Sequence, residues 1–148
     1  MNNLGSSYLR ELIRVLARNL DILEKDDANC CGITISQCHA IVEIGRKESI
    51  FLNELAEILT LDKSTMSRTI NNLVEEGLVV RKLHSEDRRY ITLKLTERGK
   101  EVFNNVEGSM NEYYKSVFTS IPELSREQVL ESLKLLVEAA NLNKHCEE

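Results

Sequence analysis

The sequence predicts a mainly α-helical chain of six helices with one small β-hairpin. Apolar residues recur at helical spacing through most of its 148 residues. The chain has one proline and no tryptophan, and it is rich in Leu, Ile, Glu and Lys, which favour helices. Only one stretch, at about residues 79–95, changes to the period and composition of strands.

The first helix is predicted from about Ser6 to Lys25. Its apolar residues follow the i, i+3, i+4, i+7 pattern: Leu9, Leu12, Ile13, Leu16, Leu20 and Leu23. The stretch "DDANCCG" is expected to break this helix. "TISQ", Thr34 to Gln37, is typical of a capping box, so a second helix should begin there and end at Gly45.

Two further helices are predicted to form a helix-turn-helix. A short third helix is indicated by Leu55, Ala56, Ile58 and Leu59. Asp62 is the expected N-cap of a fourth helix, Lys63 to Glu76, which Gly77 should end at the C′ position. Two short helices joined by such a tight turn are typical of that motif.

A β-hairpin should follow, because residues that suit strands flank the polar stretch "HSEDRR". The expected strands are Val79–Leu83 and Tyr90–Leu95. A hairpin beside a helix-turn-helix is called a wing. Residues 34–95 are therefore predicted to form a winged helix-turn-helix lobe that binds DNA.

The last two helices are predicted at about residues 97–142. Thr96 is the expected N-cap of the fifth, which should reach Phe118; Pro122 marks a break, and "SREQ", from Ser125, looks like a second capping box. With no linker in view, residues 1–148 are expected to form a single domain. The first and last helices carry more leucine than a small monomer's surface tolerates, so helices 6–25 and 97–142 are expected to form a homodimer.

No membrane segment is expected, because no apolar run approaches the ~20 residues that a membrane helix needs. Charges interleave with apolar residues at the N-terminus, unlike a signal peptide. A cytoplasmic protein without a membrane partner is therefore expected. Thiols stay reduced in that compartment, where clustered cysteines bind metals or sense oxidants more often than they form structural disulfides.

Charge is distributed unevenly along the chain. The net charge is −5, which alone argues weakly against binding nucleic acid. Between Lys63 and Lys94, however, seven basic and four acidic residues give a net charge of +3. The helix-turn-helix and wing are thus basic in an otherwise acidic chain.

The fourth helix has one apolar and one polar face. Met66, Ile70, Leu73 and Val74 fall on the first, while Ser64, Thr65, Arg68, Asn71 and Asn72 lie opposite. Arginine pairs with guanine, asparagine with adenine, and hydroxyls with phosphates, so the polar face suits a major groove. An ordinary solvated helix face is the alternative, which the turn, the wing and the local charge disfavour.

The wing tip carries Arg88 and Arg89 beside Asp87. An arginine on a narrow hairpin suits the negative minor groove, and an aspartate can restrain it by a bidentate pair. A charged surface turn with no partner is the alternative interpretation.

These motifs resemble the multiple-antibiotic-resistance regulator (MarR) family of winged-helix transcription factors over nearly the whole chain. The most specific parts are "ELAEIL", "DKSTMSRTINNLVEEGLV", the "DRR" wing and "LTERGKE", in that order and spacing. "ITISQCHAIVEIG" resembles the family's second helix.

The resemblance implies a homodimer built from the first, fifth and sixth helices, with the fourth helix in the major groove and the wing in the minor groove. Two-fold symmetry then requires a pseudo-palindromic double-stranded operator. Asp87 and Arg89 fall on the wing motif, so Arg89 is favoured over Arg88. The residues on recognition-helix positions are Ser64, Thr65, Ser67, Arg68 and Asn71, and Lys63 adds charge at the start of the helix.

"NCCGITISQCHA" is a candidate inducer site, because it holds Cys30, Cys31 and Cys38 near the expected junction of the first two helices. Three thiolates suit zinc, cadmium, mercury or trivalent arsenic, and His39 and Glu24 could join them. His145 and Cys146 could also contribute. The histidine pair that zinc sensors of the family carry in the fifth helix is missing here.

Two alternatives to a metal site remain. Oxidation could join Cys30 to Cys38 in a disulfide and move the second helix. Cys38 could also simply pack in the core with Ile35, Ile41 and Val42. The leading prediction is a repressor that such an inducer releases. A metal-binding or thiol enzyme is the rival outside DNA binding, although no acid–base partners beyond His39 surround the cysteines in the sequence.

Overall fold

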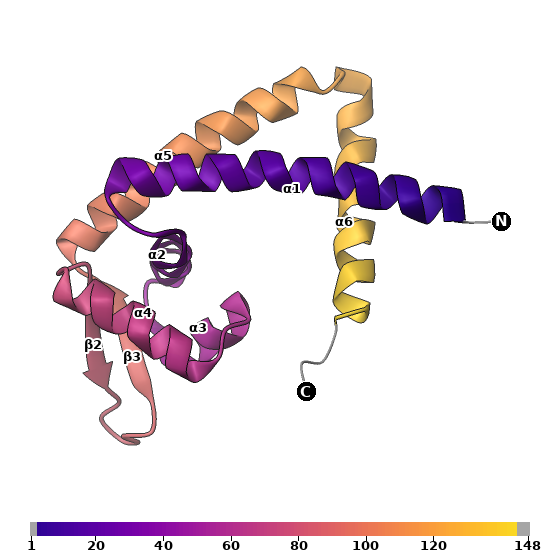
Figure 1. Cartoon of the computed structure of the whole chain (residues 1–148). Helices are drawn as coiled ribbons and strands as arrows, with labels where there is room; N and C mark the ends of the chain where they lie inside the picture. The colour runs from indigo at the N-terminus through magenta and orange to yellow at the C-terminus, as the bar shows by residue number, and fades with distance from the viewer. Residues whose placement is uncertain (1–2, 145–148) are drawn as a thin grey trace. The chain divides into compact units, whose positions relative to one another are not determined.

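A computed structural model describes residues 3–144 of the chain and the side chains of residues 4–25 and 32–144. Contacts divide the chain into two units, one ending at Ser109 and the other beginning at Met110. The helices are α1 (Asn3–Cys31), α2 (Ile35–Lys47), α3 (Leu52–Leu59), α4 (Lys63–Glu75), α5 (Glu97–Ser120), the short 3-10 helix η1 (Glu123–Ser125) and α6 (Arg126–Leu142) (Figure 1). The strands are β1 (Ile50–Phe51), β2 (Val79–Leu83) and β3 (Ile91–Leu95). The mainly α fold with a small wing is thereby confirmed.

The first helix is longer than predicted. α1 passes through the stretch that was expected to break it and ends at Cys31, followed by Gly32 at a φ of +71°. Polar residues lower helix propensity only mildly, whereas glycine takes a positive φ without strain and so ends the helix. The predicted end at Lys25 was wrong, and Cys30 lies in the last turn of α1 rather than in a loop.

The start of α2 is as predicted, but its end is not. Thr34 Oγ1 accepts a hydrogen bond from Gln37 N at 3.2 Å, and Gln37 Oε1 accepts one from Thr34 N at 3.0 Å, which confirms the capping box. The helix continues through Gly45 to Lys47. A Cβ on Gly45 would overlap the ring of Phe103, so this glycine permits the close approach of α5 and does not end α2.

The helix-turn-helix and its wing are confirmed. Asp62 caps α4 by accepting from Thr65 N at 3.1 Å, and Gly77 has a φ of +76° just beyond the helix. β3 is the middle strand of an antiparallel sheet, with β2 on one side and the unpredicted β1 on the other. A two-residue strand such as β1 is too short to leave a pattern in the sequence. Thr96 caps α5, since its Oγ1 accepts from Gly99 N at 3.0 Å.

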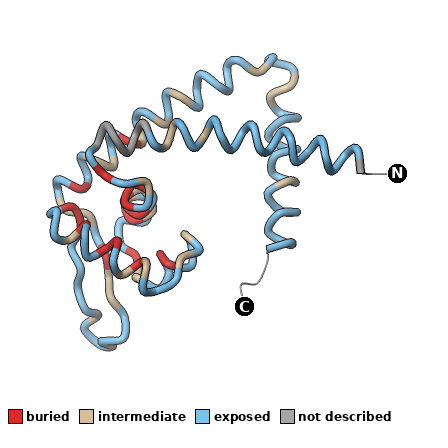
Figure 2. The backbone as a smooth tube through the Cα atoms, viewed as in Figure 1, coloured by how far each residue is buried: buried red, intermediate tan, exposed pale blue. Residues whose placement is uncertain are grey.

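Within the first unit, the core lies between α2, α3, α4 and the sheet, where the buried residues gather (Figure 2). The largest fully buried side chains are Ile41, Ile44, Leu55, Met66, Ile70, Leu73, Leu93 and Val106. This packing fixes one face of α4 and leaves the opposite face exposed.

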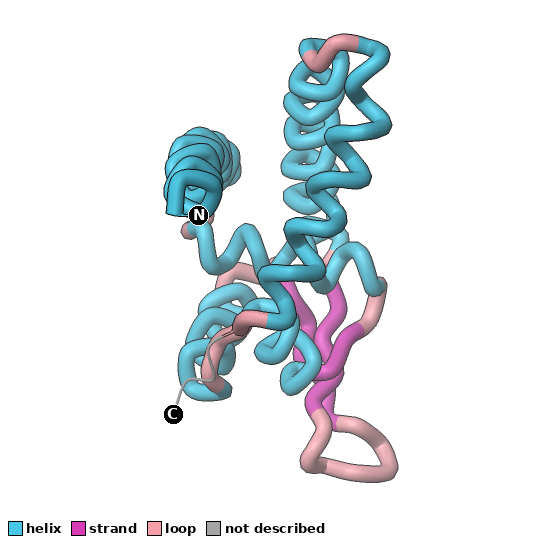
Figure 3. Tube along the Cα trace, turned by 90° about the vertical axis from the view of Figure 1, so that its right-hand side faces the viewer, coloured by secondary structure: helices cyan, strands magenta, loops and turns pink. Residues whose placement is uncertain are grey.

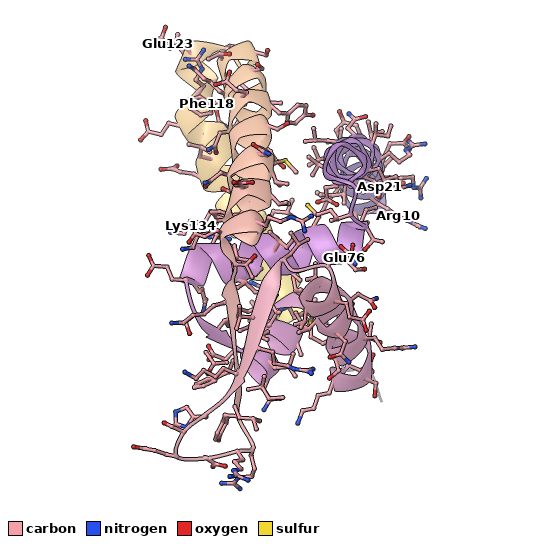
Figure 4. The ribbon with its side chains drawn as sticks, turned by 90° about the vertical axis from the view of Figure 1, so that its left-hand side faces the viewer. Arg10, Asp21, Glu76, Phe118, Glu123 and Lys134 are labelled. Carbon is pink, nitrogen blue, oxygen red and sulfur yellow. The ribbon has the colours of Figure 1, made fainter. Side chains whose placement is uncertain are left out.

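In the second unit, the start of α6 is stabilised in a way that the sequence did not predict. Ser125 is the last residue of η1 and makes no side-chain cap, so the predicted capping box there was wrong. Arg126 instead donates from Nε to the Ile121 carbonyl at 3.0 Å and covers the ring of Phe118 at 5.3 Å. Figure 4 labels Phe118 on α5 and Glu123 at the start of η1. No described helix is both long and apolar enough to span a membrane.

Candidate nucleic-acid interface

The two predicted faces of α4 are confirmed. Met66, Ile70 and Leu73 are fully buried, and Val74 is half-buried. The residues predicted to contact DNA lie on the other side: Lys63, Ser64, Arg68 and Asn71 are exposed, and Thr65 and Ser67 are half-buried. The unit thus presents a continuous polar helix face without an acidic group before Glu75.

The N-terminal end of this face is fixed by Asp62. Its carboxylate accepts hydrogen bonds from the hydroxyl of Thr65 at 2.5 Å and from the amide of Thr65 at 3.1 Å. These two bonds hold the pKa of Asp62 below its ordinary range, so the cap is ionised at neutral pH. The Thr65 hydroxyl keeps only its acceptor lone pairs for a further partner.

Asn71 is also engaged, by a residue that the sequence did not single out. Arg81 on β2 donates from Nη1 to Asn71 Oδ1. The two residues are ten positions apart, so no local motif indicated the contact. The Arg81–Asn71 contact follows only from the three-dimensional position of β2 beside α4.

The wing tip has the predicted aspartate–arginine pair. Arg89 donates to the Asp87 carboxylate from Nε at 3.0 Å and from Nη2 at 2.7 Å, and its main-chain N–H adds a bond of 3.0 Å. These contacts lower the pKa of Asp87 and raise that of Arg89. Arg89 is nonetheless 86% exposed at its side chain, so the guanidinium is oriented but accessible.

Further contacts shape the loop that carries this pair. His84 Nδ1 accepts from the main-chain N–H groups of Glu86 at 3.3 Å and Asp87 at 3.2 Å. The rings of Phe51, His84 and Tyr90 pack together at the base of the loop, with centroids 5.4–6.4 Å apart. Figure 3 shows the loop extending beyond the ends of the strands. Arg88 is exposed there and pairs with no residue that the structure describes.

The candidate sensing region is described only in part. Cys30 and Cys31 lie at the end of α1, and the structure places neither side chain; His145 and Cys146 lie outside the described residues. Cys38, on α2, is 3% exposed. His39 Nε2 lies 3.3 Å from Glu24 Oε2 and joins α2 to α1. Among the side chains that are described, no three of His, Cys, Asp and Glu come together as a metal site would require.

Comparisons with known proteins agree with this geometry. A sequence model described as "MarR family" matches residues 32–89, which hold the helix-turn-helix and the wing tip. The HTH-type transcriptional regulator BilQ of Clostridium symbiosum is 27% identical over 105 residues, which are 71% of this chain and 73% of BilQ.

Two solved structures share the fold. A MarR transcriptional regulator from Methanosarcina mazei has a TM-score of 0.79 and 27% identity, covering 93% of this chain and 99% of that one. FabT of Streptococcus pneumoniae, solved in complex with DNA, has a TM-score of 0.81 and 20% identity, with coverage of 93% and 99%. In sequence and in fold, the chain is similar to DNA-binding transcriptional regulators of the MarR family.

Proposed function

We propose that this chain is a homodimeric repressor that binds a specific, pseudo-palindromic DNA operator. α4 enters the major groove and the loop of the wing enters the minor groove. One observation carries the proposal: the exposed face of α4 has no acidic residue before Glu75, and on the wing of the same unit Asp87 orients an Arg89 that stays exposed.

The residues of these surfaces suit different parts of DNA. Arg68 is exposed and can pair bidentately with guanine, while the hydroxyls of Ser64 and Ser67 reach phosphates. Arg89 is held outward by Asp87 and suits the negative potential of a narrow minor groove. The DNA complex of FabT supports this assignment, because that protein has the same fold.

A dimer is supported by the apolar side chains that α1 and α6 leave exposed. Leu9, Leu12 and Leu16 of α1 are 44–50% exposed, and α6 has no buried residue. A second copy of the chain would cover them, and its two-fold symmetry would place two α4 helices on half-sites about one DNA turn apart.

Binding of the purified protein to its own promoter region tests the proposal. We expect a specific complex that weakens as salt is raised, because phosphate contacts release counterions. Arg68→Ala and Arg89→Ala should each reduce affinity roughly fivefold or more, since one base or groove contact is lost. Lys100→Ala is the control, because it removes the same charge from α5.

The proposed groove contacts would be refuted if both arginine variants kept the affinity of the control. Absence of any specific complex at that promoter and at neighbouring genes would refute the regulator itself.

The proposed inducer is a thiophilic ion at Cys30, Cys31 and Cys38. Two adjacent cysteines end α1, a third lies in the first turns of α2, and the Glu24–His39 contact joins the same two helices. Thiolates suit zinc, cadmium, mercury and trivalent arsenic, and binding would move α2 against α1. Oxidation to a Cys30–Cys38 disulfide is the second candidate.

Titration of the reduced protein with each ion separates the two candidates, with peroxide as a parallel arm. We expect thiolate-to-metal absorbance to rise as operator affinity falls. Cys30→Ser, Cys31→Ser and Cys38→Ser should abolish the response and leave DNA binding intact. An unchanged response in all three variants would contradict both candidates.

A further inference from the structure

Asn71 lies on the exposed face of α4, and its orientation is set from outside that helix. Arg81 reaches it from β2 and donates to Asn71 Oδ1, and both side chains are exposed. Burial of Leu78 and Val79, at 3% and 2% exposure, anchors the start of β2 beside the end of α4. The contact therefore connects the wing to α4, which is the helix proposed to contact the bases.

The chemistry of arginine fixes which way the asparagine amide points. A guanidinium has donors only, so the amide atom that faces Arg81 must be the oxygen. The NH2 group of Asn71 is then directed away from β2. Toward any third partner, the Arg81–Asn71 pair presents mainly N–H donors: the Asn71 Nδ2 hydrogens and the remaining hydrogens of the guanidinium.

We infer that Arg81 determines which base Asn71 selects, and this inference rests on the proposed function. An unrestrained asparagine reads adenine with both amide atoms, because its oxygen accepts from N6 and its nitrogen donates to N7. In this protein the oxygen is engaged by Arg81. Guanine offers two acceptors to such a donor pair, O6 and N7, whereas adenine offers only N7 beside an unmatched N6 donor. Arg81 thus shifts the preference at that base pair from adenine to guanine.

Selection of binding sites from a library of random DNA duplexes tests this inference in the full-length dimer. The wild type should prefer guanine over adenine by about tenfold at one position of each half-site. Asn71→Ala should lose this preference. Arg81→Met should free the amide oxygen and reverse the preference toward adenine. Arg81→Lys should keep guanine, because an ammonium also has donors only and would still face Asn71 Oδ1.

Lys82→Met is the matched control. Lys82 follows Arg81 on β2, is exposed and carries the same charge, but it has no described contact with α4. Its loss should weaken binding to all sequences and reduce the salt dependence, with no change of base preference.

The possible outcomes are distinct. If Arg81→Met keeps the guanine preference, as Lys82→Met should, then Arg81 acts only through its charge and the inference is wrong. If Asn71→Ala selects the same bases as the wild type, Asn71 reads no base and the inference is also wrong. If the wild type selects no DNA sequence, the proposed function is wrong, and so is this inference, which rests on it.

Discussion

At the scale of single residues, the negative charge of Asp87 should repel DNA. The position of Asp87 beside Arg89 nevertheless predicts that this residue supports DNA binding. The carboxylate holds Arg89 through three side-chain bonds, of 3.0 and 3.1 Å to Nε and 2.7 Å to Nη2. An exposed pair of this kind adds little to stability, so its role is to orient the guanidinium. Asp87→Ala should therefore weaken operator binding roughly threefold to tenfold although it removes a negative charge.

Glu86→Ala is the control for that prediction, because Glu86 precedes Asp87 and its loss changes the net charge equally. Its affinity should be unchanged or slightly higher, as measured by fluorescence anisotropy with an operator duplex. An increase in affinity for Asp87→Ala as well would show that only charge matters at the wing tip.

The pH dependence of the same pair follows from the direction of the pKa shift. Hydrogen bonds from Arg89 lower the pKa of Asp87, so the pair is complete above the ordinary carboxyl range and is lost only as pH falls through the lowered pKa. The affinity ratio of wild type to Asp87→Ala should therefore be constant between about pH 5 and pH 8. A titration of this ratio in that window would contradict the pairing.

Residues close in the chain were the ones that the sequence could pair. Thr34 with Gln37 and Asp87 with Arg89 were predicted because two or three residues suffice to define the geometry. The Arg81–Asn71 contact was missed because it depends on where β2 runs beside α4. The contact of Glu24 with His39 likewise required α1 to pack on α2.

At the scale of elements, two glycines of α5 have opposite surroundings. A Cβ on Gly99 would collide with the backbone carbonyl of Leu78, whereas Gly108 has open space around it. Gly99→Ala should cost about 1–3 kcal/mol of unfolding free energy, because backbone atoms cannot easily move away. Gly108→Ala should instead add about 0.5–1 kcal/mol, since alanine favours helices. Urea unfolding of both variants measures the difference, and equal effects would contradict the close packing at Gly99.

Element types were easier to predict than element ends. Apolar spacing and capping residues together predicted the six α-helices, because a buried face repeats over many residues and a cap has a local pattern. The predicted ends of α1 and α2 were wrong, because the sequence does not distinguish a glycine that ends a helix from one that allows close packing. Gly32 ends α1 with its positive φ, while Gly45 lies inside α2 against Phe103. Three-dimensional neighbours decide between these roles, and the sequence does not contain them.

At the scale of the whole molecule, the proposed function depends on a second copy of the chain. One α4 reads one half-site, and joining two half-sites raises affinity by about a hundredfold or more. The apolar residues of α6 are the part of that argument that can be tested most directly. Leu130 and Leu133 are 53% and 47% exposed, which is costly for leucine in water.

We expect the double variant Leu130→Glu, Leu133→Glu to be a folded monomer, because two carboxylates cannot be buried unpaired in a dimer interface. Sedimentation velocity should show the monomer, circular dichroism should show unchanged helicity, and operator affinity should fall about a hundredfold or more. Lys134→Glu, at the position labelled on α6 in Figure 4, changes the net charge by the same amount as the double variant and should stay dimeric. If the double variant remains dimeric, α6 is not the dimer interface. If the variant is monomeric but binds the full operator as tightly as the wild type, DNA binding does not depend on dimerisation through α6.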